Sequence, residues 1–331
     1  MTEAPVRVGL AGLGTWGPNL ARNFADLPNA ELAWLCDLDP ERLERVGARH
    51  PGTRTTDRFE DLLEDPTVDA VAIATPATTH AELARRALLA GKHAFVEKPL
   101  AMTAHEAELV ADLAEERGLA LVPGHLLLYH PAIRKLKEIV RSGELGQLLV
   151  VYGNRQNLGK IRRDENVLWS LGAHDLSVIL DLVDEEPLEV AARGASFLTE
   201  GVEDVVFCYL RFPSGVVAHM HLSWLDPQKM RKLTVVGDRK MAVFDDMEPE
   251  RKVTVHDKGP QEPPDGYSDW MTRSGDVVIP EVPAAEPLRL ECEHFVRVVL
   301  GEADPAPARA NGLAVVRVLE ELQASLAREP V

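Results

Sequence analysis

A glycine-rich segment directly follows an apolar run near the start of the chain. Val6–Ala11 is apolar enough for a buried parallel strand, and residues 12–17 read Gly-Leu-Gly-Thr-Trp-Gly. Pro18–Leu27 is predicted to form a helix immediately afterwards. Asp37 follows about 20 residues beyond the glycine-rich segment, at the end of a second predicted strand. A strand, a glycine-rich turn and a helix in this order predict a doubly wound sheet that binds a dinucleotide.

The three glycines would serve different purposes in such a turn. They allow a tight turn, a close approach of the backbone to a diphosphate, and close packing of the helix on the strand. The N-terminus of the helix would face the diphosphate, because its free N–H groups and its dipole favour an anion. A glycine-rich turn without a ligand is the alternative, and Asp37, placed where a ribose needs an acceptor, favours the dinucleotide.

The length and charge of the chain limit its function. With 331 residues it can form two domains, and 36 Lys and Arg against 53 Asp and Glu give a formal net charge of −17. This charge argues against binding to nucleic acid or to membrane surfaces. Cys36, Cys208 and Cys292 are isolated, which favours neither a disulfide framework nor a thiolate metal site. The first residues lack a secretory pattern and no segment approaches a membrane span, so we expect a cytoplasmic protein.

Residues 1–122 alternate strand and helix patterns, and we expect them to form the dinucleotide-binding domain. Such alternation is typical of a Rossmann-type, doubly wound parallel sheet of the α/β class. The expected strands are Val6–Ala11, Leu32–Cys36, Thr53–Thr55, Ala70–Ala74, Ala94–Val96 and Ala120–Val122. The expected helices include Asp57–Leu63, His80–Ala90 and Ala104–Arg117.

Residues 123–331 have a different pattern, and we expect them to form an α+β domain for substrate binding and oligomerisation. Strands joined by short turns predict a large, mostly antiparallel sheet with a few helices. The expected strands are Leu148–Tyr152, Glu189–Phe197, Val205–Phe212, Val216–Trp224, Lys232–Val236 and Met241–Phe244, and the expected helices are Pro131–Val140, Leu168–Val183, Leu288–Leu300 and Asn311–Arg328. Pro260–Glu286 is rich in Pro, Asp and Glu and is predicted to be an irregular connection.

Ligands of an open parallel sheet bind beyond the carboxyl ends of its strands. Three segments are predicted there: Thr75-Pro76, Glu97-Lys98-Pro99 and Gly124-His125. Lys98 follows an apolar strand and precedes a proline, which favours an extended backbone at the lysine. A lysine at this edge can meet a sugar hydroxyl beside a nicotinamide, and a solvated surface lysine is the alternative.

These residues carry a resemblance to a known family. Gly12–Gly17, Thr75-Pro76, Glu97-Lys98-Pro99 and the α+β domain that follows are similar to the glucose–fructose oxidoreductase/inositol dehydrogenase (Gfo/Idh/MocA) family, over essentially the whole chain. The resemblance implies that Lys98 is a catalytic lysine and that the peptide bond before Pro99 is cis. It also implies that the cofactor is NAD or NADP.

A narrower resemblance points to the branch of this family that acts on nucleotide sugars, represented by UDP-N-acetylglucosaminuronate 3-dehydrogenases. The segments that carry it are Trp16-Gly17-Pro18-Asn19, Gly124-His125 with Tyr129-His130-Pro131, residues 155–159 (Arg-Gln-Asn-Leu-Gly), Asn166-Val167-Leu168-Trp169 and His174-Asp175. The family resemblance makes His174 the catalytic acid/base. The family places an aspartate four residues before this histidine, where this chain has Ser170, and Asp175 points elsewhere on a helix. A core histidine is the alternative for His174.

We therefore predict three groups of site residues. The catalytic residues are Lys98 and His174. The cofactor would be held by Gly12, Gly14, Thr15, Trp16, Gly17, Asp37, Thr75, Pro76, His80, Glu97 and Lys98. The substrate would be held by His125, Tyr129, Arg155, Asn157, Arg163, Trp169 and Asp175. We assign no metal, since His219 and His221 alternate on one strand face without an obvious third ligand.

The predicted protein is an NAD-dependent dehydrogenase that oxidises a secondary alcohol of a sugar, in particular of a UDP-sugar. NAD is expected rather than NADP, because the Asp37 carboxylate would repel a 2′-phosphate and no arginine directly follows it. The cationic residues 155–163 are expected to hold a diphosphate, with an exposed, solvated loop as the alternative. Family members pair through the sheet of the second domain, so the resemblance implies a homodimer or homotetramer. The alternatives are an inositol or free-sugar dehydrogenase, a non-catalytic sugar-responsive regulator, and an NAD-dependent glycosidase.

Overall fold

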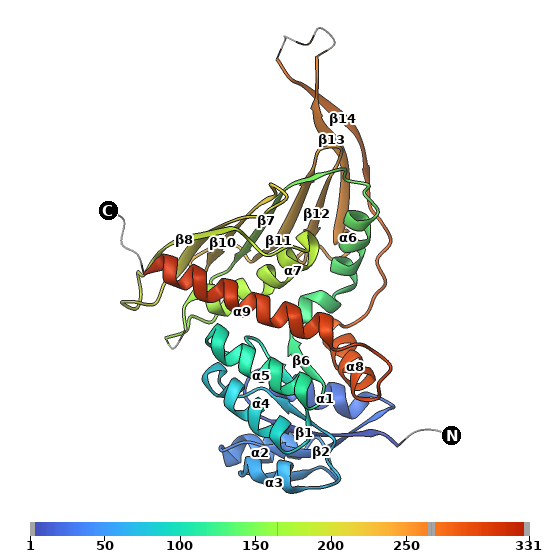
Figure 1. The fold of residues 1–331 in the computed structure, drawn as a ribbon, viewed down its shortest axis with the longest axis vertical. Helices are drawn as coiled ribbons and strands as arrows, with labels where there is room; N and C mark the ends of the chain where they lie inside the picture. The colour runs from blue at the N-terminus through green and yellow to red at the C-terminus, as the bar shows by residue number, and fades with distance from the viewer. Residues whose placement is uncertain (1–3, 164, 264–265, 267–268, 328–331) are drawn as a thin grey trace. The chain divides into compact units, whose positions relative to one another are not determined.

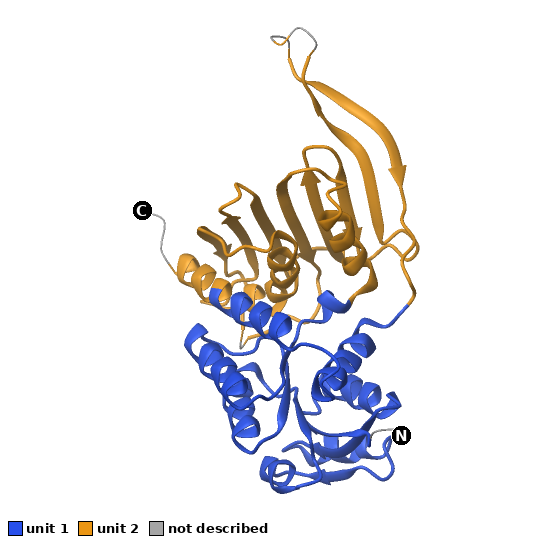
Figure 2. Cartoon of the chain, turned by 45° about the vertical axis from the view of Figure 1, so that its right-hand side comes forward, with its two compact units in different colours: residues 1–129, 285–317 blue, residues 130–284, 318–331 orange. Residues whose placement is uncertain are grey.

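The computed structural model describes residues 4–163, 165–263, 266 and 269–327, which divide into two compact units. The first unit consists of residues 1–129 and 285–317, and the second of residues 130–284 and 318–331 (Figure 2). The expected boundary after residue 122 therefore differs from the observed division, because residues 285–317 return to the first unit. Among the described residues, no helix combines the length and the apolar character that crossing a membrane requires.

The first unit is built on a six-stranded sheet with the order β3-β2-β1-β4-β5-β6, in which every pair of neighbours is parallel. This order reverses direction between β1 and β4, and ligands bind at such a switch point in open sheets. The strands are β1 (Val6–Ala11), β2 (Ala30–Cys36), β3 (Arg54–Thr56), β4 (Ala70–Ile73), β5 (His93–Glu97) and β6 (Leu121–Gly124). The predicted doubly wound sheet is confirmed.

Helices cover both faces of this sheet (Figure 1). One apolar cluster joins one face to α1 and α8, and a second cluster joins the opposite face to α3, α4 and α5. Both faces are buried, which explains the near-continuous apolar runs of the central strands. The helical segments of the unit are α1 (Gly17–Asp26), α2 (Pro40–Gly47), α3 (Phe59–Glu64), η1 (Ala77–Thr79), α4 (His80–Leu89), α5 (Ala104–Glu116), η2 (Leu126–Tyr129), α8 (Pro287–Val299) and the first part of α9 (Ala306–Leu326).

Three phenylalanines fix α8 against the first sheet. Phe95 of β5 contacts Phe295 of α8 with 5.7 Å between ring centroids, and Phe24 of α1 lies 6.2 Å from each of them, all edge to face. The three side chains are fully buried. Edge-to-face pairs add about 0.5–1.5 kcal/mol each to the free energy gained by burial. A helix from the end of the chain thus becomes part of the first unit.

The second unit is built on an eight-stranded sheet with the order β14-β13-β12-β11-β7-β10-β9-β8. All neighbours are antiparallel except β7 and β10, which are parallel. The strands are β7 (Leu148–Gln156), β8 (Glu189–Ala195), β9 (Val205–Arg211), β10 (Val217–Ser223), β11 (Met230–Gly237), β12 (Met241–Asp245), β13 (Val253–Gln261) and β14 (Met271–Val278). The predicted large, mostly antiparallel sheet is confirmed.

One face of the second sheet packs against helices, and the side chains of the other face are mostly half-buried or exposed. The helical segments of the unit are α6 (Pro131–Arg141), the π-helical turn η3 (Leu168–Gly172), α7 (Ala173–Val183) and the last part of α9. In β9 the side chains alternate, with Val206, Cys208 and Leu210 buried and Phe207 and Tyr209 exposed. The alternation is the pattern of a sheet with one covered face.

The prediction of an irregular connection over Pro260–Glu286 is wrong in part. β13 and β14 form a long antiparallel ribbon at the edge of the second sheet (Figure 2). Most side chains of β14 are exposed, so the strand lacks the apolar alternation that marks a half-buried strand. Pro260 is compatible with β13 although it has no N–H group, because the ribbon lies at the sheet edge.

Candidate functional site

The glycine-rich turn has the geometry that the sequence predicts. Gly12 has a φ of +94°, and a Cβ atom there would lie 2.5 Å from the Ala74 carbonyl carbon. A Cβ atom on Gly17 would lie 2.0 Å from the Gly12 carbonyl oxygen. At Gly14 the nearest atom to such a Cβ is 3.8 Å away, on the Arg42 side chain. Gly12 and Gly17 therefore serve backbone packing, and Gly14 leaves room for a diphosphate at the N-terminus of α1.

Asp37 links the glycine-rich turn to the end of β2. Its Oδ2 accepts a hydrogen bond of 2.6 Å from the Leu13 N–H, and its Oδ1 accepts one of 2.9 Å from the Asp39 N–H. Arg42, on α2, reaches within 3.8 Å of Asp37 Oδ2 and 3.1 Å of Asp39 Oδ2. Arg42 is not among the predicted site residues, because it does not directly follow Asp37; its three-residue helical spacing from Asp39 is the signal that finds it.

His80 joins two of the loops that follow parallel strands. The side chain is 1% exposed. Its Nδ1 lies 2.7 Å from the Pro99 carbonyl oxygen, and its Nε2 lies 2.9 Å from the Thr75 carbonyl oxygen. The peptide bond between Lys98 and Pro99 is cis, as the resemblance implies. His80, which is predicted from the sequence to contact a cofactor, thus joins the loops that carry Thr75 and Lys98.

Lys98 lies at the carboxyl edge of the first sheet, close to two buried titratable side chains. The Glu97 Oε2 accepts a hydrogen bond of 3.2 Å from the Lys98 N–H. Burial raises the pKa of Glu97 to about 7, and the positive charge of Lys98 opposes that rise. Burial lowers the pKa of His125 to about 4, and the charge of Lys98 lowers it further. Within the described part of the chain, neither ring nitrogen of His125 has a hydrogen-bond partner.

His174 lies on the first turn of α7, after the π-helical turn η3. The Ser177 hydroxyl donates a hydrogen bond of 2.8 Å to the His174 carbonyl oxygen. Ser170, at the position where the resemblance implies an aspartate, is buried on η3, and its N–H donates to the Asn166 carbonyl oxygen at 3.1 Å. A π-helical turn is wider than an α-helical one, so the sequence spacing of four does not fix how Ser170 faces His174.

Arg155 and Asp175 form a buried ion pair in the second unit. Arg155 belongs to β7, and its Nη2 and Nε lie 2.6 Å and 3.0 Å from Asp175 Oδ1. The two side chains are only 7% and 5% exposed. Both residues are predicted from the sequence to bind substrate, and in the structure the charge of Arg155 is already balanced by Asp175. The pair joins β7 to α7 beside His174.

The other predicted substrate residues have varied surroundings. The Trp169 indole donates a hydrogen bond of 3.1 Å to Gln323 Oε1. The Tyr129 ring lies 5.3 Å from the His294 ring. The N–H of Asn157 donates to the Ser223 carbonyl oxygen at 3.1 Å, just beyond the end of β7. Arg163 is exposed, so of the two predicted cationic substrate residues only this one presents its charge to solvent.

Three histidines considered in the sequence have aromatic neighbours in the second unit. His219 stacks on Tyr152 with 4.9 Å between ring centroids, and His221 stacks on Phe207 at 4.3 Å. His130 is the N-cap of α6, where its Nδ1 accepts a hydrogen bond of 3.1 Å from the Ala132 N–H, and its ring meets a phenylalanine edge to face. The described residues include no group of three or more His, Cys, Asp or Glu arranged to hold a metal ion.

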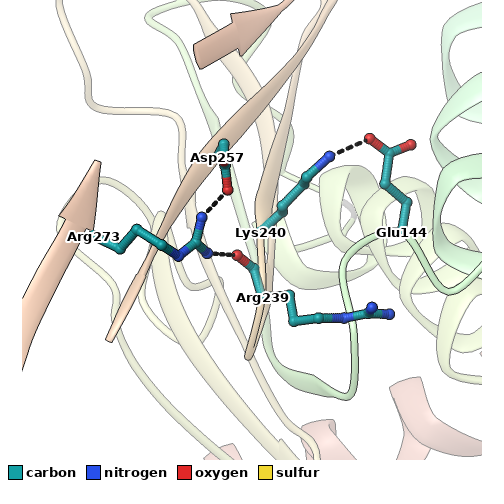
Figure 3. A pocket seen from close by; sticks show the side chains of 5 residues that line it. All are labelled: Glu144, Arg239, Lys240, Asp257 and Arg273. Atoms are coloured by element: carbon teal, nitrogen blue, oxygen red, sulfur yellow. Dashed lines mark hydrogen bonds and ion pairs between the residues drawn. The ribbon is translucent and has the colours of Figure 1, made fainter. Parts of the chain in front are cut away.

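A cavity of about 450 Å³ in the second unit contains none of the predicted site residues. Charged side chains line it: Glu144, Arg239, Lys240, Asp257 and Arg273 (Figure 3). Lys240 pairs with Glu144 at 2.9 Å, and Arg273 pairs with Asp257. Because two of its three cations are already neutralised inside the cavity, it is a weaker candidate for a ligand site than the loops around Lys98.

Comparison with known proteins identifies the family. Residues 6–125 match the profile of an oxidoreductase family with an NAD-binding Rossmann fold, GFO_IDH_MocA, and residues 133–243 match the GFO/IDH/MocA C-terminal domain. The UDP-N-acetylglucosamine 3-dehydrogenase of Acidithiobacillus ferrooxidans is 31% identical over 241 residues, which cover 72% of this chain and 74% of that protein. A solved structure of a UDP-N-acetylglucosamine 3-dehydrogenase from A. ferrooxidans aligns with a TM-score of 0.79 and 27% identity, over 97% of this chain and 99% of that one. The scyllo-inositol 2-dehydrogenase (NAD⁺) of Bacillus subtilis is 29% identical over 68% of this chain and 69% of that protein.

Proposed function

The chain belongs to the Gfo/Idh/MocA family of NAD-binding oxidoreductases, and we propose that it is an NAD-dependent dehydrogenase that oxidises a secondary alcohol of a nucleotide sugar at the 3-position. The observation that carries the proposal is the likeness to a UDP-N-acetylglucosamine 3-dehydrogenase, which extends over both units in sequence and structure. The inositol dehydrogenase among the relatives makes oxidation of an inositol the second candidate.

The residues of the first unit fit a nicotinamide dinucleotide. The diphosphate would lie at the glycine-rich turn, where Gly14 leaves space beside the N-terminus of α1. Asp37 keeps lone pairs for ribose hydroxyls although it already accepts two backbone hydrogen bonds. The negative charge of Asp37 disfavours a 2′-phosphate, which makes NAD the preferred cofactor. Arg42 partly offsets that charge, so it reduces the preference for NAD over NADP. When bound, the nicotinamide supplies the hydride chemistry.

Lys98 and His174 have separate roles in the proposed reaction. Lys98 holds the substrate oxygen and stabilises the charge that develops on it. His174 takes the hydroxyl proton as general base, which contributes on the order of 10²–10⁴-fold to the rate. The role of Lys98 is supported by its place after β5 beside Glu97 and His125. The role of His174 is supported by the family resemblance and by the rigid ion pair that anchors the start of α7.

The nucleotide part of the substrate would be recognised by the segment that follows β7. Arg155 is engaged by Asp175, so the recognition of a diphosphate falls on the exposed cations beyond it, Lys160 and Arg163. Arginine and lysine are suited to phosphate oxygens, and both lie against an acidic background.

A second copy of the chain would cover the exposed face of the second sheet. Phe207 is 54% exposed and Tyr209 37% exposed on β9, next to the stacked pair of Tyr152 and His219. Aromatic side chains gathered on one face of a sheet are typical of an interface. Light scattering after chromatography tests this: we expect a dimer or tetramer, and Phe207→Ser with Tyr209→Ser should weaken it.

The proposed activity is tested by following NADH formation at alkaline pH with a panel of substrates. We expect UDP-N-acetylglucosamine or its uronate to be oxidised more efficiently than N-acetylglucosamine, myo-inositol or scyllo-inositol. Efficient oxidation of an inositol would move the chain to the second candidate. Binding of NADH without turnover of any substrate would favour a non-catalytic regulator, and release of free sugar at constant NADH would favour a glycosidase.

A further inference from the structure

Two buried carboxyl groups lie in the apolar core that joins α8 to the first sheet. Glu97 is 8% exposed at the end of β5, and Glu291 is fully buried on α8. In the part of the chain that the structure describes, neither carboxyl oxygen of Glu291 has a hydrogen-bond partner. A buried carboxyl without partners is costly, and such groups concentrate at functional sites. The proposed reaction gives Glu291 no role.

The fold brings the two carboxyls toward each other. Phe95 and Phe295 touch across the interface of β5 and α8. Glu97 lies two residues after Phe95, so it points to the same face of the sheet. Glu291 lies four residues before Phe295, so it occupies the same face of the helix. The negative charge of Glu97 accordingly raises the pKa of Glu291, after the larger effect of burial.

The remaining titratable groups around the pair limit its charge. Lys98 is the cation nearest to Glu97, and His125 is kept neutral by burial and by Lys98. Cys292 stays a thiol, because burial and the Glu291 charge raise its pKa. Arg22 of α1 is paired with Glu286 ahead of α8. Since two close carboxylates in an apolar core do not both ionise, the pair carries at most one negative charge near neutral pH.

We propose that Glu97 and Glu291 form a coupled carboxyl pair whose negative charge determines how strongly the protein prefers the oxidised to the reduced dinucleotide. The proposal rests on the dinucleotide binding of the proposed function. The nicotinamide half of the cofactor belongs beyond the carboxyl end of β5. In the strand order, β5 lies in the half of the sheet that does not contain β2 and Asp37. An oxidised nicotinamide ring carries a positive charge and a reduced ring does not, so only the oxidised form is stabilised by a carboxylate there.

The sign of the pH dependence follows from this charge. Because the oxidised ring favours the carboxylate, it lowers the pKa of the pair below the value of about 7 that Glu97 has without cofactor. At a pH between the pKa of the pair with NAD⁺ bound and its pKa without cofactor, binding of NAD⁺ therefore releases a proton to solvent. The affinity for NAD⁺ rises with pH over that window, by at most tenfold per pH unit, and levels off above pH 7. The affinity for NADH stays flat.

Calorimetric titration in buffers of different ionisation enthalpy counts the protons released. At pH 6.5 we expect a fraction of one proton released with NAD⁺ and none with NADH. Glu97→Gln should abolish the release and lower the affinity for NAD⁺ by about tenfold at pH 8, with the affinity for NADH unchanged. Glu108→Gln removes an exposed carboxylate of α5 that pairs with Arg317 and should change neither. NAD⁺ binding without proton release, or release that persists in Glu97→Gln, would overturn the proposal.

A measurement without cofactor separates this proposal from the proposed function. With glutamate labelled at the side-chain carboxyl carbon, NMR titration should show one carboxyl that titrates near neutrality and one that stays protonated above it. Glu97→Gln and Glu291→Gln assign the two signals, and Glu97→Gln should lower the midpoint of Glu291, because it removes the negative charge that raises the pKa of Glu291. If both carboxyls titrate at ordinary acidic pH, the pair does not exist even where NAD binds. If the pair titrates as described but no dinucleotide binds, the proposed function fails instead.

Discussion

A cluster of buried titratable side chains in the first unit and one in the second differ in how far their charges are compensated. In the second unit Arg155 and Asp175 face each other within 2.6 Å and are almost completely buried, so their charges compensate each other although Asp175 Oδ2 has no hydrogen-bond partner among the described residues. In the first unit Glu97, His125 and Glu291 surround the end of β5, and several of their polar atoms have no partner among the described residues. The pKa values of these three groups are shifted strongly by burial.

The difference separates a structural cluster from a functional one. A buried ion pair with good geometry holds two elements together, and its charges are not available to a ligand. Buried titratable groups without an opposite charge in hydrogen-bond contact, whose pKa values are shifted by burial, retain the capacity to bind and to exchange protons. The cluster of the first unit is therefore the candidate for proton exchange that accompanies cofactor binding, whereas the ion pair of the second unit holds β7 against α7, the helix that carries His174.

The largest expected effect is a loss of turnover on substitution of Lys98, which a second buried or half-buried lysine of the first unit, Lys92, should not share. Lys98→Ala should reduce turnover by about 10²–10⁴-fold while changing the Kd for NADH little, because the lysine acts on the substrate oxygen. Lys92 is the matched control, since its buried ammonium donates to the carbonyl oxygens of Asp65 and Val68 at 2.9 Å and 2.7 Å. Lys92→Met should lower the free energy of unfolding and leave kcat per folded molecule near the native value.

Steady-state kinetics measure the turnover of Lys98→Ala and Lys92→Met, and a fluorescence titration with NADH measures their Kd for the cofactor. Near-native turnover in Lys98→Ala would remove the catalytic assignment from this edge of the sheet.

The second-largest effect is expected for the buried ion pair of Arg155 and Asp175. Asp175→Ala should lower the free energy of unfolding by about 3–5 kcal/mol, because it leaves the Arg155 charge buried without its counter-ion. The double substitution Arg155→Met with Asp175→Leu should recover most of that loss, since it removes both charges. Urea denaturation of the three proteins measures the difference. A change of less than 1 kcal/mol in the single variant would mean that the pair is open to solvent, and Arg155 would again be a candidate for phosphate binding.

The sequence predicts the first unit better than the second for a physical reason. Strands buried on both faces produce the continuous apolar runs around Val71 and Phe95, and the parallel topology then places Lys98 at the ligand edge. The pairing of Arg155 with Asp175 joins two segments distant in sequence and leaves no local pattern. The same holds for Glu291, whose return to the first sheet depends on the packing of Phe295. The ribbon of β13 and β14 could not be predicted from alternating apolar and polar residues, because most side chains of β14 are exposed.

A smaller effect is expected for the choice of cofactor. Asp37→Ala should weaken NAD binding by roughly 10–100-fold, because it removes the acceptor for ribose hydroxyls and frees Arg42. NADP should bind better to the variant than to the native protein. Asp39→Ala separates the two contributions: it removes the cap of α2 on the N–H of Glu41 at 3.0 Å, which should cost about 1 kcal/mol of stability, and it also releases Arg42 from Asp39 while the Asp37 carboxylate stays in place, so NAD binding should weaken much less than in Asp37→Ala. Native protein that binds NADP more tightly than NAD would contradict the role of Asp37.

The smallest effect contrasts the exposed Arg163 with the buried Arg155. Arg163→Ala should raise the KM for a UDP-sugar by about two- to fivefold without changing stability, since exposed charge pairs contribute on the order of 0.2–1 kcal/mol. The KM should also rise with added salt in the native protein, and that salt dependence should be weaker in the variant. Arg155→Ala should instead lower stability, because it leaves Asp175 buried without a partner. The same measurements with a free sugar are the control, because a substrate without a diphosphate should be insensitive to Arg163. An equal KM for the native protein and Arg163→Ala at low salt would show that this segment does not recognise the diphosphate.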